Sequence, residues 1–126
     1  MLLDTNIVIY ACRPGGEWLA PWTEGAHACV ASVTEIEALG FASIKPDEER
    51  AIEELFATCV VHALDQAVID RAVLVRRGSK IATLDAIIAA TALEHDVILV
   101  TRNVEDFEGV EGLRVINPFE ESGAPR

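Results

Sequence analysis

Short apolar segments alternate with helix-like segments along the whole chain, and this alternation limits the possible fold more than any other feature. The clearest apolar strand is predicted at residues 97–100, directly after a helix predicted at residues 84–94 that is apolar almost all round. Parallel strands need helical crossovers of this kind, and strands covered on both faces are continuously apolar. The pattern therefore predicts an α/β fold, with parallel strands in one sheet and helices on both of its faces.

The remaining elements follow from the same periodicity and from the Pro and Gly positions that end helices. Further strands are expected at residues 1–3, 29–31, 60–62 and 113–116. Further helices are expected at residues 5–12, 17–24, 33–44, 46–58 and 65–77. A chain of 126 residues suits one domain, which we expect over residues 1–119, with a C-terminal tail at residues 120–126.

Composition excludes several classes of protein. A net charge of -11 argues against a protein that coats nucleic acid through general electrostatics, although it allows local contacts. No apolar run approaches the length of a membrane span, and the N-terminus lacks a basic segment with a cleavage site. Cys12, Cys29 and Cys59 are too far apart for a CxxC metal site and too few for a disulfide framework. These features predict a cytoplasmic location.

Carboxylate and amide side chains occur at the ends of predicted strands and on a helix face that should be buried. These residues are Asp4, Glu37, Asp85, Asn103 and Asp106. A carboxylate is costly to desolvate without a partner, and several carboxylates together repel one another unless a cation or shared protons neutralise them. Their joint occurrence at one edge of the predicted sheet indicates a metal-dependent enzyme that acts on phosphate.

Two glutamates on the helix predicted at residues 33–44 receive different interpretations. Ser32 and Glu35 form the pattern of a capping box, so helix capping explains Glu35. Glu37 instead lies on the apolar stripe formed by residues 33, 36, 40 and 44. A carboxylate on the core face of a helix predicts a functional role for Glu37.

Each of the other acidic positions also has a purely structural interpretation. Asp4 is a good N-cap for the helix that follows it. Asp85 lies in a first helical turn, where the helix dipole stabilises an anion. Asn103 and Asp106 suit a turn or cap after a strand. These alternatives stay open for each residue taken alone.

The basic and aromatic residues give weaker signals. One basic cluster precedes Asp85 and consists of Arg76, Arg77 and Lys80. Helix capping explains this cluster, and RNA binding is the alternative. Arg102 stands next to Asn103 and is a candidate contact to phosphate. Trp18 and Trp22 are one helical turn apart, which favours core packing over an RNA-binding platform.

Four stretches together resemble the PIN-domain ribonucleases, and within them the toxins of the VapC type. They are residues 2–6 (LLDTN), 32–40 (SVTEIEALG), 84–92 (LDAIIAATA) and 99–107 (LVTRNVEDF), and the closing VINPF at 115–119 also matches. The resemblance covers nearly the whole chain. It implies a PIN-like three-layer α/β/α sandwich with a central, mainly parallel sheet of short strands.

The resemblance also implies the site residues and a cofactor. The family's first three acids correspond to Asp4, Glu37 and Asp85, and its fourth position corresponds to Asn103 or to Asp106. Mg²⁺, or alternatively Mn²⁺, is expected on Asp4 and Asp85, with Glu37 and Asp106 completing or orienting the ligand set.

The implied function is an endoribonuclease that serves as the toxin of a toxin–antitoxin pair and uses metal-activated water. The expected partners are a cognate VapB-type antitoxin, the RNA substrate and a second copy of the chain in a homodimer. The alternatives are a catalytically silent PIN-like binding module, a receiver-type domain phosphorylated on Asp4, and a DNA nuclease. The receiver alternative lacks a paired acid near Asp4 and a lysine after a late strand. The DNA nuclease alternative lacks room for a duplex-binding insertion.

Overall fold

A five-stranded parallel sheet forms the centre of the molecule, in the computed structural model that describes residues 1–25, 27–121 and 124–125. In spatial order its strands are β3 (Val60–His62), β2 (Cys29–Ala31), β1 (Leu2–Leu3), β4 (Leu99–Val100) and β5 (Val115–Ile116). The α-helices are α1 (Thr5–Ala11), α2 (Ala20–Thr23), α3 (Ser32–Leu39), α4 (Pro46–Thr58), α5 (Gln66–Gly78) and α6 (Thr83–Glu94). The 3-10 helices are η1 (Glu17–Leu19), η2 (Val104–Phe107) and η3 (Pro118–Glu120). Within the described ranges, no helix is long and apolar enough to cross a membrane.

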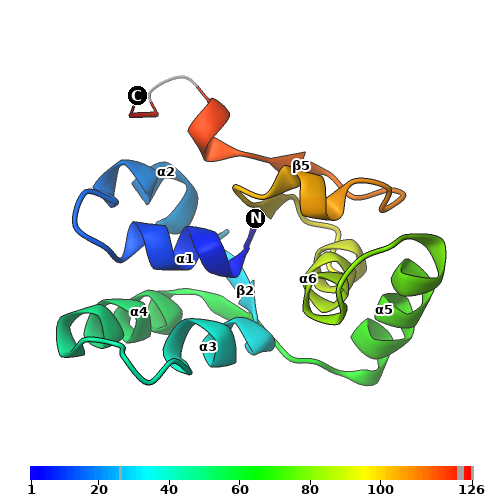
Figure 1. Ribbon diagram of the computed structural model, residues 1–126, viewed down its shortest axis with the longest axis horizontal. Helices are drawn as coiled ribbons and strands as arrows, with labels where there is room; N and C mark the ends of the chain where they lie inside the picture. Colours follow the sequence, from blue (N-terminus) through cyan, green and yellow to red (C-terminus); the bar gives the residue numbers. More distant parts are fainter. Residues whose placement is uncertain (26, 122–123, 126) are drawn as a thin grey trace.

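Helices cover both faces of this sheet. Side chains alternate along a strand, so Leu2 and Leu99 enter one core while Leu3 and Val100 enter the other. The first core lies under α5 and α6, and the second lies under α1 and α4. Figure 1 shows these two groups of helices on opposite sides of the strands. The α/β sandwich predicted from the sequence is confirmed.

The register of the two central strands determines where the first acidic residue lies. Leu3 pairs with Val100, so the residues that follow, Asp4 and Thr101, leave the sheet side by side. The backbone hydrogen bond from Asp4 N to Val100 O, at 2.9 Å, continues the ladder past the last strand residue. The carboxyl edge of the sheet therefore brings residues from the start and the end of the chain together.

Several predicted boundaries are wrong by a few residues. The helix predicted at residues 33–44 is α3 and ends at Leu39, because Gly40 is its C-cap and the chain leaves the helix there. A Cβ atom at Gly40 would lie 2.3 Å from the Ile36 carbonyl oxygen, so a larger residue does not fit this exit. The strands predicted at 97–100 and 113–116 keep only two residues each. Within the predicted tail, residue 120 belongs to η3, while residues 122, 123 and 126 lie outside the described residues.

Two local predictions about α3 are also wrong. The capping box does not form, because the N-cap is Ala31 and Ser32 already lies inside the helix. The Ser32 hydroxyl oxygen instead accepts a hydrogen bond from the Leu64 backbone N–H at 3.2 Å. Ile36, predicted on the buried stripe, is 73% exposed. The buried face of α3 is formed by Val33, Thr34 and Ala38.

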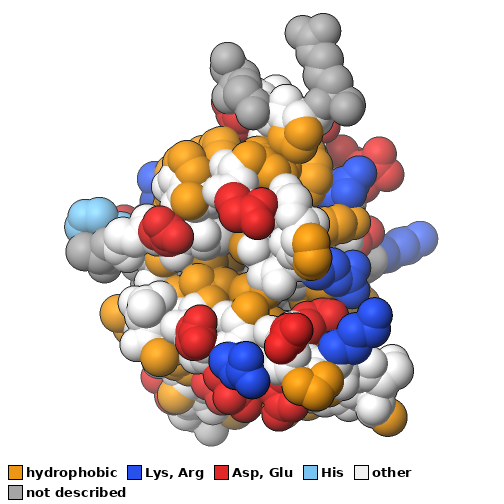
Figure 2. All heavy atoms as spheres, turned by 90° about the vertical axis from the view of Figure 1, so that its left-hand side faces the viewer, with side chains coloured by type: hydrophobic (Ala, Val, Ile, Leu, Met, Phe, Trp, Pro, Cys, Tyr) orange, Lys and Arg blue, Asp and Glu red, His pale blue; other side chains and the backbone are white. Residues whose placement is uncertain are grey.

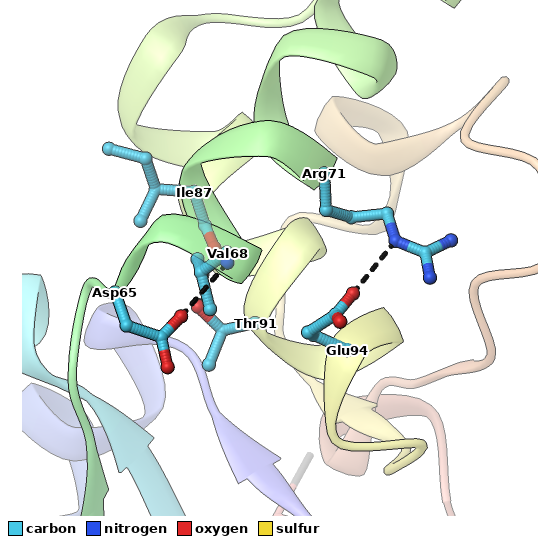
Figure 3. Close-up of polar contacts among 6 residues, drawn as sticks. All are labelled: Asp65, Val68, Arg71, Ile87, Thr91 and Glu94. Carbon is cyan, nitrogen blue, oxygen red and sulfur yellow. Dashed lines mark hydrogen bonds and ion pairs between the residues drawn. The ribbon is translucent and has the colours of Figure 1, made fainter.

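Helices α5 and α6 pack as a pair that positions the start of α6. Figure 3 shows the polar contacts of this pair, including the Asp65 carboxylate that caps α5 by accepting from the Val68 N–H at 3.0 Å. Farther along, Arg71 Nε lies 3.0 Å from Glu94 Oε2 and ties α5 to the last turn of α6 (Figure 3). The Arg71–Glu94 contact holds α6 at its C-terminal end. Arg76 Nη1, which donates to Thr83 Oγ1 at 2.7 Å, holds the first turn of α6, which carries Asp85.

Candidate active site

Asp4 is the most buried of the predicted site residues and is held by three hydrogen bonds. Its side chain is 6% exposed. Oδ1 accepts from the Thr5 N–H at 2.8 Å, while Oδ2 accepts from Thr101 Oγ1 at 2.7 Å and from Asn6 Nδ2 at 3.0 Å. Burial raises the pKa of Asp4 above its ordinary value, and the nearby Glu37 raises it further, although the hydrogen bonds oppose this shift. Asp4 is therefore both the N-cap of α1 and a fixed acid at the sheet edge.

Glu37 joins the same site from α3. Thr5 Oγ1 donates to Glu37 Oε1 at 2.8 Å and lies 3.2 Å from the hydroxyl of the fully buried Thr34. Glu37 and Thr34 are one turn apart on the inner face of α3, so both reach the first turn of α1. The prediction that Glu37 lies on the inner face of its helix is thus confirmed. The prediction that Ile36 shares that face is wrong.

Asp85 shows most clearly that the acids converge. It lies half-buried in the first turn of α6, and its pKa is raised to about 6. Burial is the largest cause, followed by the negative charges of Asp4, Asp106 and Glu37. The carboxylates of Asp4, Glu37 and Asp106 are therefore close enough to repel the negative charge of Asp85.

The segment after β4 supplies the fourth acid, Asp106. It also supplies the hydroxyl of Thr101, which bonds to Asp4 and to the backbone of the loop. Thr101 Oγ1 accepts from the Asn103 backbone N–H at 3.0 Å while it donates to Asp4. Asn103 is exposed at the N-cap of η2, where its side chain makes no capping hydrogen bond. Asp106, in the first turn of η2, is the residue of this loop whose charge acts on Asp85.

The predicted basic residues take two different positions. Arg76 and Arg77 are exposed in the last turn of α5, and Arg76 Nη1 donates to Thr83 Oγ1 at the start of α6 with a distance of 2.7 Å. Arg102 lies closer to the acids, since its backbone N–H donates at 3.2 Å to Asn6 Oδ1. Its guanidinium group stacks on aromatic rings, a feature that the sequence analysis missed because those rings are distant in the chain.

In the part of the chain that the structure describes, the acids do not form a complete set of metal ligands. Over residues 1–25, 27–121 and 124–125, no three His, Cys, Asp or Glu side chains are placed so that they hold one metal ion. The donors are nevertheless all carboxylates, and the charges of Asp4, Asp106 and Glu37 add to the effect of burial in raising the pKa of Asp85. Hard divalent cations suit such a site, because Mg²⁺ keeps several waters and needs only one or two carboxylates.

Comparisons with known proteins agree over most of the chain. The family model described as "PIN domain" matches residues 1–113. The tRNA(fMet)-specific endonuclease VapC of Salmonella typhimurium is 30% identical over 125 residues, which span 90% of this chain and 94% of that protein. Ribonuclease VapC2 of Haemophilus influenzae is 35% identical over 127 residues, or 92% and 96% of the two chains.

A solved structure shares both the fold and the sequence pattern. A toxin–antitoxin complex from Klebsiella pneumoniae contains a chain that matches with a TM-score of 0.76 and 32% identity. The match covers 95% of this chain and 98% of that chain. The sheet order, the convergent acids and these relatives together show that the chain belongs to the PIN-domain family, among its VapC ribonucleases.

Proposed function

We propose that this chain is a metal-dependent endoribonuclease that acts as the toxin of a toxin–antitoxin pair and hydrolyses RNA phosphodiester bonds. The observation that carries the proposal is that Asp4 and Glu37, far apart in the chain, both bond to Thr5 at the sheet edge, where Asp106 is also close enough for its charge to act on Asp85. Folding brings these charges together at a cost, and a phosphate-cleaving metal site explains why they are there. The names of the VapC relatives support the same activity.

The proposed cofactor is Mg²⁺, with Mn²⁺ as a substitute. Asp4 and Asp85 are the proposed ligands, and Glu37 and Asp106 complete or orient the site. The bound ion supplies a water of lowered pKa and stabilises charge on the phosphate. Among the chain's own groups, Thr101 and Asn6 hold the Asp4 carboxylate in one orientation.

For the fourth position we propose Asp106 rather than Asn103. The charge of Asp106 contributes to the raised pKa of Asp85, whereas the hydrogen bond of Asn103 comes from its backbone N–H. Arg76, Arg77 and Lys80 remain candidates for RNA contacts, because they precede α6 and Arg76 lies against its first residue.

The proposed partners are a VapB-type antitoxin and a second copy of the chain. A groove of about 1360 Å³ is lined by acidic residues and by apolar ones such as Phe41 and Leu55. Its acidic residues are Glu17, Glu24, Asp47, Glu48 and Glu54. Figure 2, which looks onto the side of α1, α2 and α4, shows acidic side chains interspersed with apolar ones. These five acids outnumber the two basic residues of the lining, Arg13 and Lys45, so the groove suits a basic, amphipathic segment of an antitoxin.

Support for a homodimer comes from a different surface. Large apolar side chains are exposed along β3 and α5, in particular Val60 (55%), Val73 (43%) and Leu74 (60%). Exposed large apolar side chains mark interaction surfaces in soluble proteins where they form a contiguous patch, which the proposed homodimer requires of these residues. The proposal places this activity in the cytoplasm, which agrees with three free cysteines.

The test is cleavage of total RNA by purified protein that is free of antitoxin, with Mg²⁺, with Mn²⁺ or with EDTA. Discrete fragments that need the metal and disappear in Asp4→Ala are expected, with 3′-hydroxyl and 5′-phosphate ends. Folded protein that leaves all RNA intact in Mg²⁺ and Mn²⁺ would instead favour a silent PIN-like binding module.

A further inference from the structure

A cluster of aromatic rings lies on the surface beside the acidic site. It includes both tryptophans and the only tyrosine of the chain. Tyr10 meets Phe119 edge-on with ring centroids 5.2 Å apart, Trp18 meets Phe119 at 4.9 Å, and Trp22 meets Trp18 at 6.2 Å. All four rings are half-buried, and only Trp22 and Phe119 also pack against a core. The cluster therefore presents aromatic surface to solvent rather than filling the interior.

Arg102 completes this cluster. The carbon at the centre of its guanidinium lies 4.3 Å from the centroid of the Phe119 ring and 5.1 Å from that of Tyr10. Nη1 also donates to the Tyr10 hydroxyl at 2.9 Å, which fixes the orientation of the planar cation. The residue is still exposed in this position. We call Tyr10, Trp18, Phe119 and Arg102 the aromatic platform.

The aromatic platform is joined to the acidic site by one residue. Asn6 accepts at Oδ1 from the Arg102 backbone N–H at 3.2 Å and donates from Nδ2 to Asp4 Oδ2 at 3.0 Å. Tyr10 is one helical turn beyond Asn6 on α1, so its ring lies on the same side of the helix. A ligand whose phosphate lies at Asp4 therefore has its neighbouring groups within reach of the platform.

Nucleotides carry the chemistry that such a surface recognises. Unpaired bases stack on aromatic rings and on the plane of an arginine, and the guanidinium also pairs with phosphate. The Arg102 guanidinium also adds a positive charge to the platform in a chain of net charge -11, and this charge offsets local repulsion of an RNA backbone.

We propose that the aromatic platform is a base-stacking subsite that holds an unpaired nucleotide of the RNA next to the bond that is cleaved. This inference rests on the proposed ribonuclease function and deepens it. The substrate it selects is a single-stranded loop or end, because a base inside a duplex is not free to stack on protein rings. Arg102 and Phe119 then determine RNA affinity, while the four acids determine the rate of the chemistry.

The test measures binding rather than cleavage. In EDTA, the quenching of tryptophan fluorescence reports binding of a single-stranded octa-adenylate and of an abasic ribose-phosphate octamer. The unsubstituted protein should bind the octa-adenylate about tenfold more tightly. Phe119→Leu and Arg102→Lys should remove this difference, and Phe119→Tyr, which keeps a ring, should retain it. Phe56→Leu on α4 is the matched control and should behave like the unsubstituted protein.

The outcomes separate this proposal from the ribonuclease itself. Equal binding of the two octamers by the unsubstituted protein would overturn the platform, even if metal-dependent cleavage of total RNA persists. The proposal also fails if Phe119→Leu, folded as judged by its thermal transition, keeps the full preference for bases. Loss of antitoxin binding in that variant with unchanged RNA binding would assign the cluster to a protein contact instead. In cleavage assays, Arg102→Lys should raise KM about tenfold with a smaller change in kcat.

Discussion

Asp4 and Asp85 carry the same functional group at one site, yet they differ in burial and in the number of hydrogen bonds that they accept. Asp4 is almost fully buried and accepts three hydrogen bonds, from Thr5, Asn6 and Thr101. Asp85 is only half-buried, and the hydrogen bonds among the described residues include no side-chain or backbone donor to its carboxylate. Pairing of β1 with β4 brings the Thr101 hydroxyl to Asp4, whereas Asp85, at the start of α6, is stabilised only by the helix dipole. Asp4 is therefore part of the structure of the domain, whereas the carboxylate of Asp85 lowers the stability of the domain.

The largest expected effect is that of Asp4→Ala. Cleavage should fall on the order of 10³-fold or more, because the substitution removes a proposed metal ligand. Unfolding in urea should also become easier by about 1–3 kcal/mol, since the hydroxyl of Thr101 and the amide of Asn6 lose their acceptor and α1 loses its cap. An unchanged unfolding midpoint would contradict the conclusion that Asp4 stabilises the fold.

Asp85→Asn should lose activity to a similar degree but gain stability. The amide keeps the size of the side chain and removes its repulsion with Asp4, Asp106 and Glu37. After allowance for solvent screening of a half-exposed group, the gain should be about 1 kcal/mol at pH 7 in EDTA. Urea unfolding measures the change, with Asp70→Asn on the exposed face of α5 as a control. A destabilised Asp85→Asn protein would show that Asp85 has a stabilising partner.

Thr101→Val should have a smaller effect, because it leaves all four acids in place and removes one of the three donors that orient Asp4, together with the acceptor of the Asn103 N–H. The substitution keeps the shape of the side chain and removes the hydroxyl that donates to Asp4 Oδ2 at 2.7 Å. Cleavage should fall by about 10–100-fold, the loss typical for groups that orient a metal ligand. Raising the Mn²⁺ concentration should restore part of the rate, and a rate that stays low at saturating metal would contradict a positioning role.

The smallest expected effect is on the pH dependence of stability. It compares the stacked histidines His62 and His95 with Asp85 of the acidic site. His62 stacks on His95 with ring centroids 3.6 Å apart, and burial, then His95, then the N-terminal charge lower the pKa of His62 below 6.5. The folded state then binds fewer protons than the unfolded state, so this contribution to stability is complete above pH 6.5 and is lost as the pH falls through the lowered pKa. Asp85 has the opposite sign, because its raised pKa contributes stability at low pH that is lost as the pH rises through about 6.

Comparison of thermal transitions at pH 7.5 and pH 5 isolates the histidine contribution. His62→Gln should lose less stability on acidification than the unsubstituted protein, by a fraction of a kcal/mol, since His62 is partly exposed. The carboxylates are the same in both proteins and cancel in the difference. An identical pH response of the two proteins would rule out the histidine effect.

The sequence predicted the features that depend on neighbouring residues. Asp4 at a strand end and Glu37 on the inner face of a helix were recognisable because strand and helix periodicity place side chains locally. The capping box at Ser32 and Glu35 failed because α3 begins at Ser32, with Ala31 as its N-cap, and the Ser32 hydroxyl instead accepts from Leu64 N–H, 32 residues away. Local pattern carries no information about such a distant contact.

Long-range pairing explains the other features that were missed. Thr101 was not singled out as a partner of Asp4, because the contact depends on the register of β1 and β4. The platform formed by Tyr10, Phe119 and Arg102 also joins three distant parts of the chain. The expectation that Trp18 and Trp22 pack in the core holds in part for Trp22, which contacts one core cluster, while Trp18 lies in the surface cluster.

The central proposal is that Asp4 and Asp85 hold one divalent metal ion, with Glu37 and Asp106 completing or orienting the site, and Mn²⁺ binding followed by electron paramagnetic resonance tests it most directly. Asp4→Asn and Asp85→Asn should each weaken binding by about 10–100-fold. Glu35→Gln, on the exposed side of the helix that carries Glu37, should bind Mn²⁺ like the unsubstituted protein. Mn²⁺ affinity that stays the same in both Asp variants would contradict the claim that these acids act together.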